Sequence, residues 1–466
     1  MAKNNTIDMT LGSPWKVIIT FAIPVFLSGL FQQLYNSVDS LIVGNFLGKQ
    51  ALAAVSSSGN LIFLFTSFFT GTAMGAGVLI ANYFGQKHYD DMSKAIHTDV
   101  ALGLISSVVL TILGVFLTPY ILRLMGTAED VLPQSIIYFR NYFFGITGVI
   151  MYNIFTGILQ SIGDSKRPLY YLIVSSILNI CLDLLFVGYF KFGVDSAAIA
   201  TAISQFLSAF LCFTYLIRKG TVYQLKIKEI KIHKNMLGKI IKYGVPSGIQ
   251  NSVIGLANVF VQANINSFGS SAMAGCGSYA KINGFTFLPI TSFTLALSTY
   301  ISQNLGAKEY ERAKKGARFG IITSVLLAES IGVITFFFGK IFISLFSSEP
   351  DVVQIGALEC TISGLFYCLL AYSHCVASVC KGAGKPVVPM LVMLIDWCFI
   401  RVLFITIMMK FDHNIIYLFW AYPLTWGISS VFFYFYFHFS NWQHGLDKNN
   451  ITSKDIKDIE DVITVD

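Results

Sequence analysis

The chain has 466 residues, of which 55% are hydrophobic and only 12% are charged. A soluble domain carries about 25% charged residues, so this composition excludes a soluble globular protein. The net charge of +7 lies mainly in connections between long apolar runs, where it sets membrane topology and contacts anionic lipid, so it calls for no nucleic acid.

Twelve apolar segments follow one another, and each is long enough to cross a bilayer, which takes roughly 20 mostly apolar residues. No signal-peptide cleavage site follows the first segment, so we expect an uncleaved span. The predicted spans cover 17–43, 52–81, 95–118, 135–159, 168–190, 195–217, 239–265, 275–302, 317–338, 353–379, 387–409 and 414–438.

The second half of the chain repeats the first at a spacing of about 221 residues. The matching positions are Gly85-Gln86-Lys87 with Gly306-Ala307-Lys308, Gly163 and Pro168 with Gly384 and Pro389, and Pro24 with Pro246 after a one-residue slip. Internal repeats of this kind are typical of secondary transporters. We therefore expect two related lobes of six spans each, around a central cleft.

The distribution of Lys and Arg predicts the topology. Connections after even-numbered spans hold 19 of these residues, and connections after odd-numbered spans hold five. The positive-inside rule then places both termini and the even-numbered loops in the cytoplasm. Because each half has an even number of spans, the two lobes are expected to be parallel, related by an axis along the membrane normal.

The expected division of the chain follows from these spans. A cytoplasmic amino terminus covers 1–16, an amino-terminal lobe covers 17–217 and a basic linker covers 218–238. A carboxy-terminal lobe covers 239–438, and a polar, acidic tail covers 439–466.

The first span carries one polar stripe. Ser28, Gln32, Tyr35, Asn36 and Asp39 follow one another at helical spacing on one face. A carboxylate near the bilayer centre costs about 3 kcal/mol on insertion scales, so Asp39 is expected to face a wet cavity. The alternative is a solvated position near the membrane interface.

Spans 4 to 6 add further polar groups. Asn179 and Asp183 are four residues apart and share one helix face. Thr201 and Asn153 lie on neighbouring spans. Together with Asp39 they offer oxygen ligands, which suit a proton or a sodium ion. The alternative is hydrogen bonds that only join helices, and for Asn153 and Thr201 taken alone that alternative is preferred.

The second half offers fewer candidates and no enzyme chemistry. Asp396 and Arg401 in span 11 are expected to pair locally or to reach the interface. The other charged or titratable residues within the spans of this half are Glu329, Glu359, Lys281, Lys381 and His374. No Walker-type loop or histidine ligand spacing occurs. The eight cysteines lack metal-type spacing and are expected to pack as small apolar residues. We therefore expect no enzyme activity, no cofactor, and no metal beyond a transported sodium ion.

Five stretches taken together resemble the multidrug and toxic compound extrusion (MATE) family, prokaryotic branch, over residues 10–440. They are Leu34-Tyr35-Asn36-Ser37-Val38-Asp39 with Gly44, Gly163-Asp164-Ser165-Lys166-Arg167-Pro168, Asn179-Ile180-Cys181-Leu182-Asp183, Gly193-Val194-Asp195-Ser196-Ala197-Ala198-Ile199-Ala200-Thr201, and Gln303-Asn304-Leu305-Gly306-Ala307.

The resemblance implies twelve helices in two lobes and cation-coupled drug efflux. It also implies that Asp39, Asn179, Asp183 and Thr201 form a cation site in the amino-terminal lobe, and that Pro24 lies where the first helix bends. Some members of the family carry carboxylates on spans 7 and 10. Here span 7 has amides instead, including Asn258 and Gln262, which favours coupling through the amino-terminal lobe.

These observations predict a monomeric antiporter in the plasma membrane. It would export lipophilic, often cationic, compounds against protons or sodium, with Gln32, Tyr35, Asn36, Asn258 and Gln262 as cleft candidates. Two alternatives remain. A lipid-precursor flippase of the same superfamily would need several cationic side chains in the cleft, and a membrane enzyme acting on lipid-linked sugars would need an acid, base or nucleophile constellation.

Overall fold

The computed structural model describes residues 7–124 and 131–446, and within these ranges it contains helices and no strands. The helices form twelve consecutive rods, each of which coincides with one predicted span. Their bounds are α1 Pro14–Leu47, α2 Lys49–Gln86, α3 Tyr89–Leu124, α4 Leu132–Phe144 with α5 Ile146–Ser161, α6 Lys166–Asp183 with η1 Leu184–Tyr189, α7 Val194–Leu216, α8 Lys234–Asn266, α9 Ser270–Thr286 with α10 Leu288–Gly306, α11 Tyr310–Ser344, α12 Pro350–Gly364 with α13 Tyr367–Gly382, α14 Val387–Met393 with η3 Leu394–Ile400 and α15 Arg401–Phe411, and α16 Ile416–Phe439.

Most of these rods have the length and composition of membrane spans. Among the described residues eight qualify, or ten when the pairs α4–α5 and α12–α13, bent by 47° and 57°, each count as one span. The other two rods, α2 and α8, have 38 and 33 residues, which is enough to cross a bilayer. The predicted all-α membrane fold is confirmed. Residues 447–466 of the predicted acidic tail lie outside the described residues.

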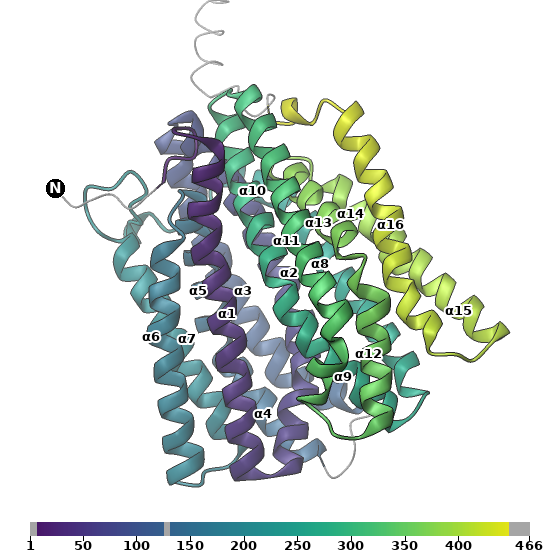
Figure 1. The fold of residues 1–466 in the computed structure, drawn as a ribbon. Helices are drawn as coiled ribbons and strands as arrows, with labels where there is room; N and C mark the ends of the chain where they lie inside the picture. Colours follow the sequence, from purple (N-terminus) through teal and green to yellow (C-terminus); the bar gives the residue numbers. More distant parts are fainter. Residues whose placement is uncertain (1–6, 125–130, 447–466) are drawn as a thin grey trace, which may run out of the picture.

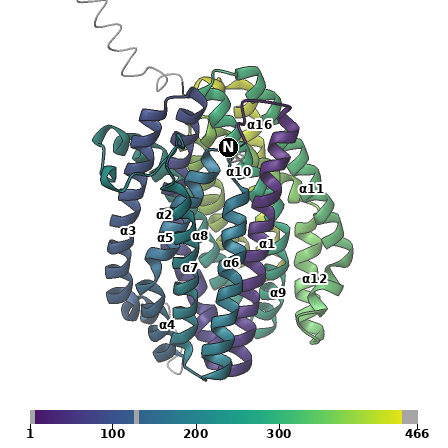
Figure 2. The same cartoon turned by 90° about the vertical axis from the view of Figure 1, so that its left-hand side faces the viewer.

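The rods divide into two lobes, α1–α7 and α8–α16 (Figure 1). In Figure 2 the amino-terminal lobe faces the viewer, and α6 lies between α7 and α1, with which it makes extensive contacts. This order brings the polar faces of three helices together inside one lobe.

The two lobes meet most extensively where α2 packs against α8. Both helices carry two glycines one turn apart, Gly71 and Gly75 on α2 and Gly244 and Gly248 on α8. A Cβ added to Gly71 would lie 2.6 Å from the Cα of Gly248. Small residues at this spacing let two helix backbones approach closely in a membrane, so they fix where the lobes touch.

Buried hydrogen bonds join the lobes near the end of the molecule where α1 begins. The Ser302 hydroxyl on α10 donates to the carbonyl of Val78 on α2 (2.6 Å), and Gln303 Nε2 donates to the carbonyl of Ser161 (2.7 Å). Gln303 Oε1 also accepts from the backbone N–H of Met9 (3.0 Å). The chain before α1 is thereby tied to the opposite lobe.

The basic linker packs against the start of α3. His97 Nε2 accepts from the backbone N–H of Lys226 (3.0 Å), and the Thr98 hydroxyl accepts from the backbone N–H of His233 (3.2 Å). These contacts turn residues 97 and 98 toward the linker, so the next residue on the helix, Asp99, faces the inside of the lobe, where it is 5% exposed.

Candidate cation and substrate sites

The buried polar face of α6 forms the base of the first site. Asn179 and Asp183 lie one turn apart, with exposures of 2% and 0%. Asp183 is the last residue of α6, and the π-helical segment η1 begins immediately after it. π-Helical turns inside membrane helices often occur at functional sites. Here the change in helical pitch begins at a buried carboxylate.

Asp39 on α1 lies beside Asp183, close enough for the two carboxyl groups to interact. Both oxygens of Asp183, one oxygen of Asp39 and both polar atoms of Asn179 have no hydrogen-bond partner in the protein. Among the described residues no Lys, Arg or His forms an ion pair with either aspartate. Burying two such charges without a counter-charge is very unfavourable, so the arrangement calls for a bound proton or cation.

A small cavity lies one helical turn from this pair, at the level of Asn179 on α6 and Tyr35 on α1, and neither aspartate lines it. Its volume of about 10 Å³ is close to the minimum that holds one water molecule, about 10–15 Å³. Seven side chains line it, all with an oxygen: Tyr35, Ser175, Ser176, Asn179, Thr201, Ser204 and Gln205. The structure therefore brings Thr201 and Tyr35 to the same site as Asn179.

Four of these residues did not emerge from the sequence. Ser175, Asn179 and Asp183 recur every four residues on α6, and Thr201 and Gln205 do the same on α7. Extending the search for a polar stripe from α1 to these two helices would have found Ser175 and Gln205. Ser176 and Ser204 carry no such signal, because isolated serines are common in membrane helices.

A central cavity of about 310 Å³ lies between the lobes. Residues of α1, α2, α5, α6 and α7 line it on one side, and four residues of α10 line it on the other. Ser28, Gln32 and Asn153 are part of the wall, and Gln205 lines both this cavity and the small one beside it. Tyr35 lies beside Gln32 and Gln205, so a continuous set of polar groups connects the two cavities.

The structure places other predicted residues outside the small cavity. Asn153 lines the central cavity but not the small one that holds Asn179. Asn36, Asn258 and Gln262 are exposed and line neither, and Gln262 donates to Asn266 (2.9 Å). Pro24 is buried inside a continuous α1, where its carbonyl accepts from the Ser28 hydroxyl (2.9 Å).

The charges of the second half have other surroundings. Glu329 accepts from the backbone N–H of Cys368 (2.9 Å), at the start of α13. Asp396 and Arg401 are both fully buried and form no ion pair with each other. The expectation that they pair locally or reach the interface is therefore wrong. Arg401 instead lies over the rings of Trp397 and Tyr422, and this aromatic environment provides its stabilisation.

The cysteines and acidic residues show no metal centre of the usual kind. All eight cysteines are free. Among the described residues no three His, Cys, Asp or Glu side chains gather where they would hold a metal ion. The paired carboxylates at Asp39 and Asp183, with amide and hydroxyl oxygens around them, remain the strongest candidate for binding a small cation.

The sequence is similar to known bacterial proteins along almost its whole length. It is 29% identical over 435 residues to the probable multidrug resistance protein YoeA of Bacillus subtilis, which covers 92% of this chain and 94% of that protein. It is 28% identical over 395 residues to the probable multidrug resistance protein YpnP of the same organism, which covers 84% and 88%.

The fold is similar to that of a solved multidrug resistance MATE family transporter of the MOP superfamily in an outward-facing conformation. The TM-score is 0.87 at 19% identity, over 97% of this chain and all of that one. The MatE family model matches the chain twice, over residues 24–185 and 246–407. These two matches are the two halves of the internal repeat. The chain therefore belongs to the MatE family of multi-pass membrane transporters.

Proposed function

We propose that this protein is a secondary active multidrug efflux transporter. It exports lipophilic, often cationic, compounds by antiport against protons or sodium, through a cleft that opens alternately to each side. The observation that carries the proposal is the pair of uncompensated carboxyl groups, Asp39 and Asp183, which Tyr35 and Gln205 connect to the central cavity. The names of its curated relatives support multidrug efflux.

The carboxyl pair supports ion coupling through the amino-terminal lobe. When a proton or sodium ion occupies the pair, it compensates the negative charge, and the surrounding oxygens bind it. When the ion leaves, the negative charge returns next to Tyr35, which lies beside Gln205 in the wall of the central cavity. An organic cation in that cavity is then favoured, and ion and substrate replace each other.

The lining of the central cavity supports an uncharged or cationic substrate. Its described lining residues include apolar side chains such as Met74, Leu172 and Leu295 together with hydroxyl and amide groups, but no Lys or Arg. A pyrophosphate headgroup would need such cations, so the lining argues against a lipid-precursor flippase. Polar groups interspersed in an apolar wall are typical of small-molecule sites.

The contact between the lobes supports alternating access. The hydrogen bonds of Ser302 and Gln303 close the end where α1 begins. If this end is cytoplasmic, as the basic loops predict, the structure corresponds to a state closed toward the cytoplasm. Pro24 removes one backbone hydrogen bond in α1 and so supplies a place for that helix to bend. The protein then acts as a monomer in the plasma membrane, without a cofactor.

Transport in proteoliposomes tests this proposal. We expect wild type to export a fluorescent organic cation when a proton or sodium gradient is imposed, and Asp39→Asn and Asp183→Asn each to lose at least about tenfold of that rate. The two gradients are imposed separately to identify the ion. Asp351→Asn, an exposed carboxylate at the start of α12, serves as the matched control. Undiminished gradient-driven export by Asp39→Asn would contradict the proposal.

A further inference from the structure

The amino-terminal lobe contains a further buried carboxylate away from the Asp39–Asp183 pair. Asp99 lies on α3 and is 5% exposed, and the ion pairs of the described residues do not include it. The Thr72 hydroxyl lines the same cavity as Asp99, but it donates to the carbonyl of Phe68 (3.0 Å). A buried carboxylate without a counter-charge is costly inside a membrane span, so Asp99 calls for a cationic partner.

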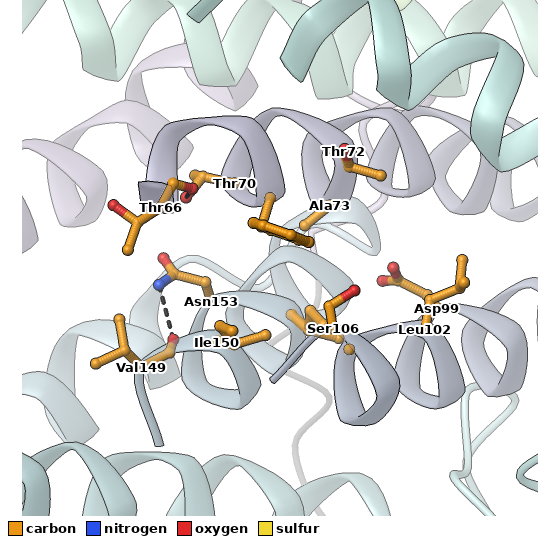
Figure 3. Close-up of a pocket in the computed structure, with 13 residues that line it drawn as sticks. Thr66, Thr70, Thr72, Ala73, Asp99, Leu102, Ser106, Val149, Ile150 and Asn153 are labelled. Atoms are coloured by element: carbon orange, nitrogen blue, oxygen red, sulfur yellow. Dashed lines mark hydrogen bonds between the residues drawn. The ribbon is translucent and has the colours of Figure 1, made fainter. Parts of the chain in front are cut away.

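Asp99 lies at one end of a cavity between α2, α3 and α5. Figure 3 shows its carboxyl group directed into this space, with Thr70 and Asn153 at the opposite end. Thr70 and Asn153 also line the central cavity, as do Ala73 and Val149. The cavity is therefore a side branch of the central cavity, and it ends at a carboxylate.

Most of the wall of this side branch is apolar, and it includes Phe69, Leu102, Ile150 and Ile154. A sodium ion prefers a shell of oxygen ligands, which one carboxylate in an apolar wall does not supply. An organic ammonium group fits better, because its N–H groups pair with the carboxylate and its carbon atoms contact the apolar side chains. An apolar wall with one charged group that fixes orientation is typical of small-molecule sites.

The volume of the side branch limits what it can hold. It measures about 40 Å³, and one water-sized group takes roughly 10–15 Å³, so there is room for about three such groups. An ammonium nitrogen with a short alkyl stem has this size. A ring system does not fit, and it would stay in the central cavity of about 310 Å³.

We propose that this side branch is a subsite for the basic arm of the exported compound. An alkylammonium group at the end of that arm pairs with Asp99, while the body of the molecule occupies the central cavity. The inference rests on the proposed export of organic cations through the central cavity, and it names which of them are favoured. Compounds with a short aliphatic amine arm bind more tightly than compounds of the same size without one.

Ligand binding to the purified full-length protein in nanodiscs tests the subsite. The probes are two fluorescent dansylamides of the same size, one with an aminoethyl arm that is charged at neutral pH and one with a neutral hydroxyethyl arm. We expect wild type to bind the amino probe at least about tenfold more tightly than the hydroxyl probe. Asp99→Asn should remove this preference without weakening the hydroxyl probe. Asp90→Asn, an exposed carboxylate of the same helix, and Asp39→Asn/Asp183→Asn should both keep it.

A second variant tests the path to Asp99 without changing the carboxylate. Ala73 lines both cavities, so Ala73→Val narrows the entrance of the side branch and should reduce the preference several-fold, with a melting temperature near that of wild type. The inference is overturned if wild type does not prefer the amino probe, or if Asp99→Asn still prefers it. The proposed antiport is judged separately, from gradient-driven export by wild type and Asp39→Asn, so the two failures are distinguishable.

Discussion

Gly71 on α2 and Gly248 on α8 face each other so closely that neither has room for a side chain. A Cβ on Gly71 would meet the Cα and the N of Gly248, each at 2.6 Å. The obstacle is the backbone of the opposite lobe, which cannot move aside by changing rotamer as a side chain can. The distance between the lobes is therefore set by the absence of a side chain at these two positions.

Gly71→Leu should separate the lobes and destabilise the protein. Overpacking of a close contact typically costs about 1–3 kcal/mol, and here backbone must move. We expect a melting temperature several degrees lower in detergent, together with loss of export. Gly277→Ala is the control, because a Cβ there would meet nothing within 4 Å. Equal melting temperatures for the two variants would mean that the contact between α2 and α8 does not set the spacing.

Gln303→Ala should loosen the closed end. The Gln303 side chain bridges the N–H of Met9 and the carbonyl of Ser161, and each buried group left without a partner costs about 1–3 kcal/mol. We expect amide hydrogen exchange in residues 7–12 to accelerate by about 5- to 150-fold. Gln354→Ala, an exposed position on α12, should leave these rates unchanged. Slow exchange in Gln303→Ala would show that this bridge does not hold the amino terminus.

Thr201→Val should weaken ion binding at the Asp183 site without unfolding the lobe. The substitution keeps the shape of the side chain but removes one oxygen from the small cavity. A hydrogen bond to a charged group contributes about 1.5–3 kcal/mol, so the ion concentration for half-maximal transport should rise at least about tenfold. Thr214→Val is the control on the same helix, because Thr214 does not line the small cavity and its hydroxyl donates to the backbone carbonyl of Leu211. An unchanged ion dependence in Thr201→Val would remove Thr201 from the site.

The fold was largely predictable because membrane spans have a strong sequence signal. Twelve apolar segments and the duplicated glycine and proline framework are properties of composition and order, and both were read correctly. The bends between α4 and α5 and between α12 and α13 were not foreseen. Gly145 and Gly364 lie at these bends, but glycine is frequent in membrane helices, so it does not by itself indicate a break.

The surroundings of individual charges were less predictable. Asp99 lies within a predicted span, yet its sequence neighbours face the linker and gave no polar stripe. The sequence groups Asn153 with Asp183 because the two lie on neighbouring spans, whereas the structure places Asn153 in the wall of the central cavity and of a smaller cavity that Asp99 also lines. Helical spacing identifies which residues share a face on one helix. It does not identify which face of another helix lies opposite.

The topology can be tested directly, because the positive-inside rule makes an unambiguous expectation. Fluorescent protein fused after residue 225, in the basic linker, should fluoresce, and alkaline phosphatase fused there should be inactive. Fusions after Asp412, between α15 and α16, should give the opposite result. Comparing the two reporters at each position controls for differences in expression. Active phosphatase at residue 225 would invert the assignment and place the closed end of the molecule outside the cell.

Arg401 should not tolerate replacement by lysine, although the charge is kept. Its guanidinium lies 4.7 Å from the ring centre of Trp397 and 4.6 Å from that of Tyr422, and it donates to the Thr425 hydroxyl (2.8 Å). A planar guanidinium stacks between two rings, whereas a lysine ammonium is a strongly hydrated point charge. Each desolvated cation–π contact contributes about 0.5–2 kcal/mol, and Arg401 is completely buried.

We therefore expect Arg401→Lys to lower the melting temperature by several degrees, and the exposed Arg318→Lys to leave it unchanged. If both variants melt with wild type, the aromatic rings do not stabilise this charge.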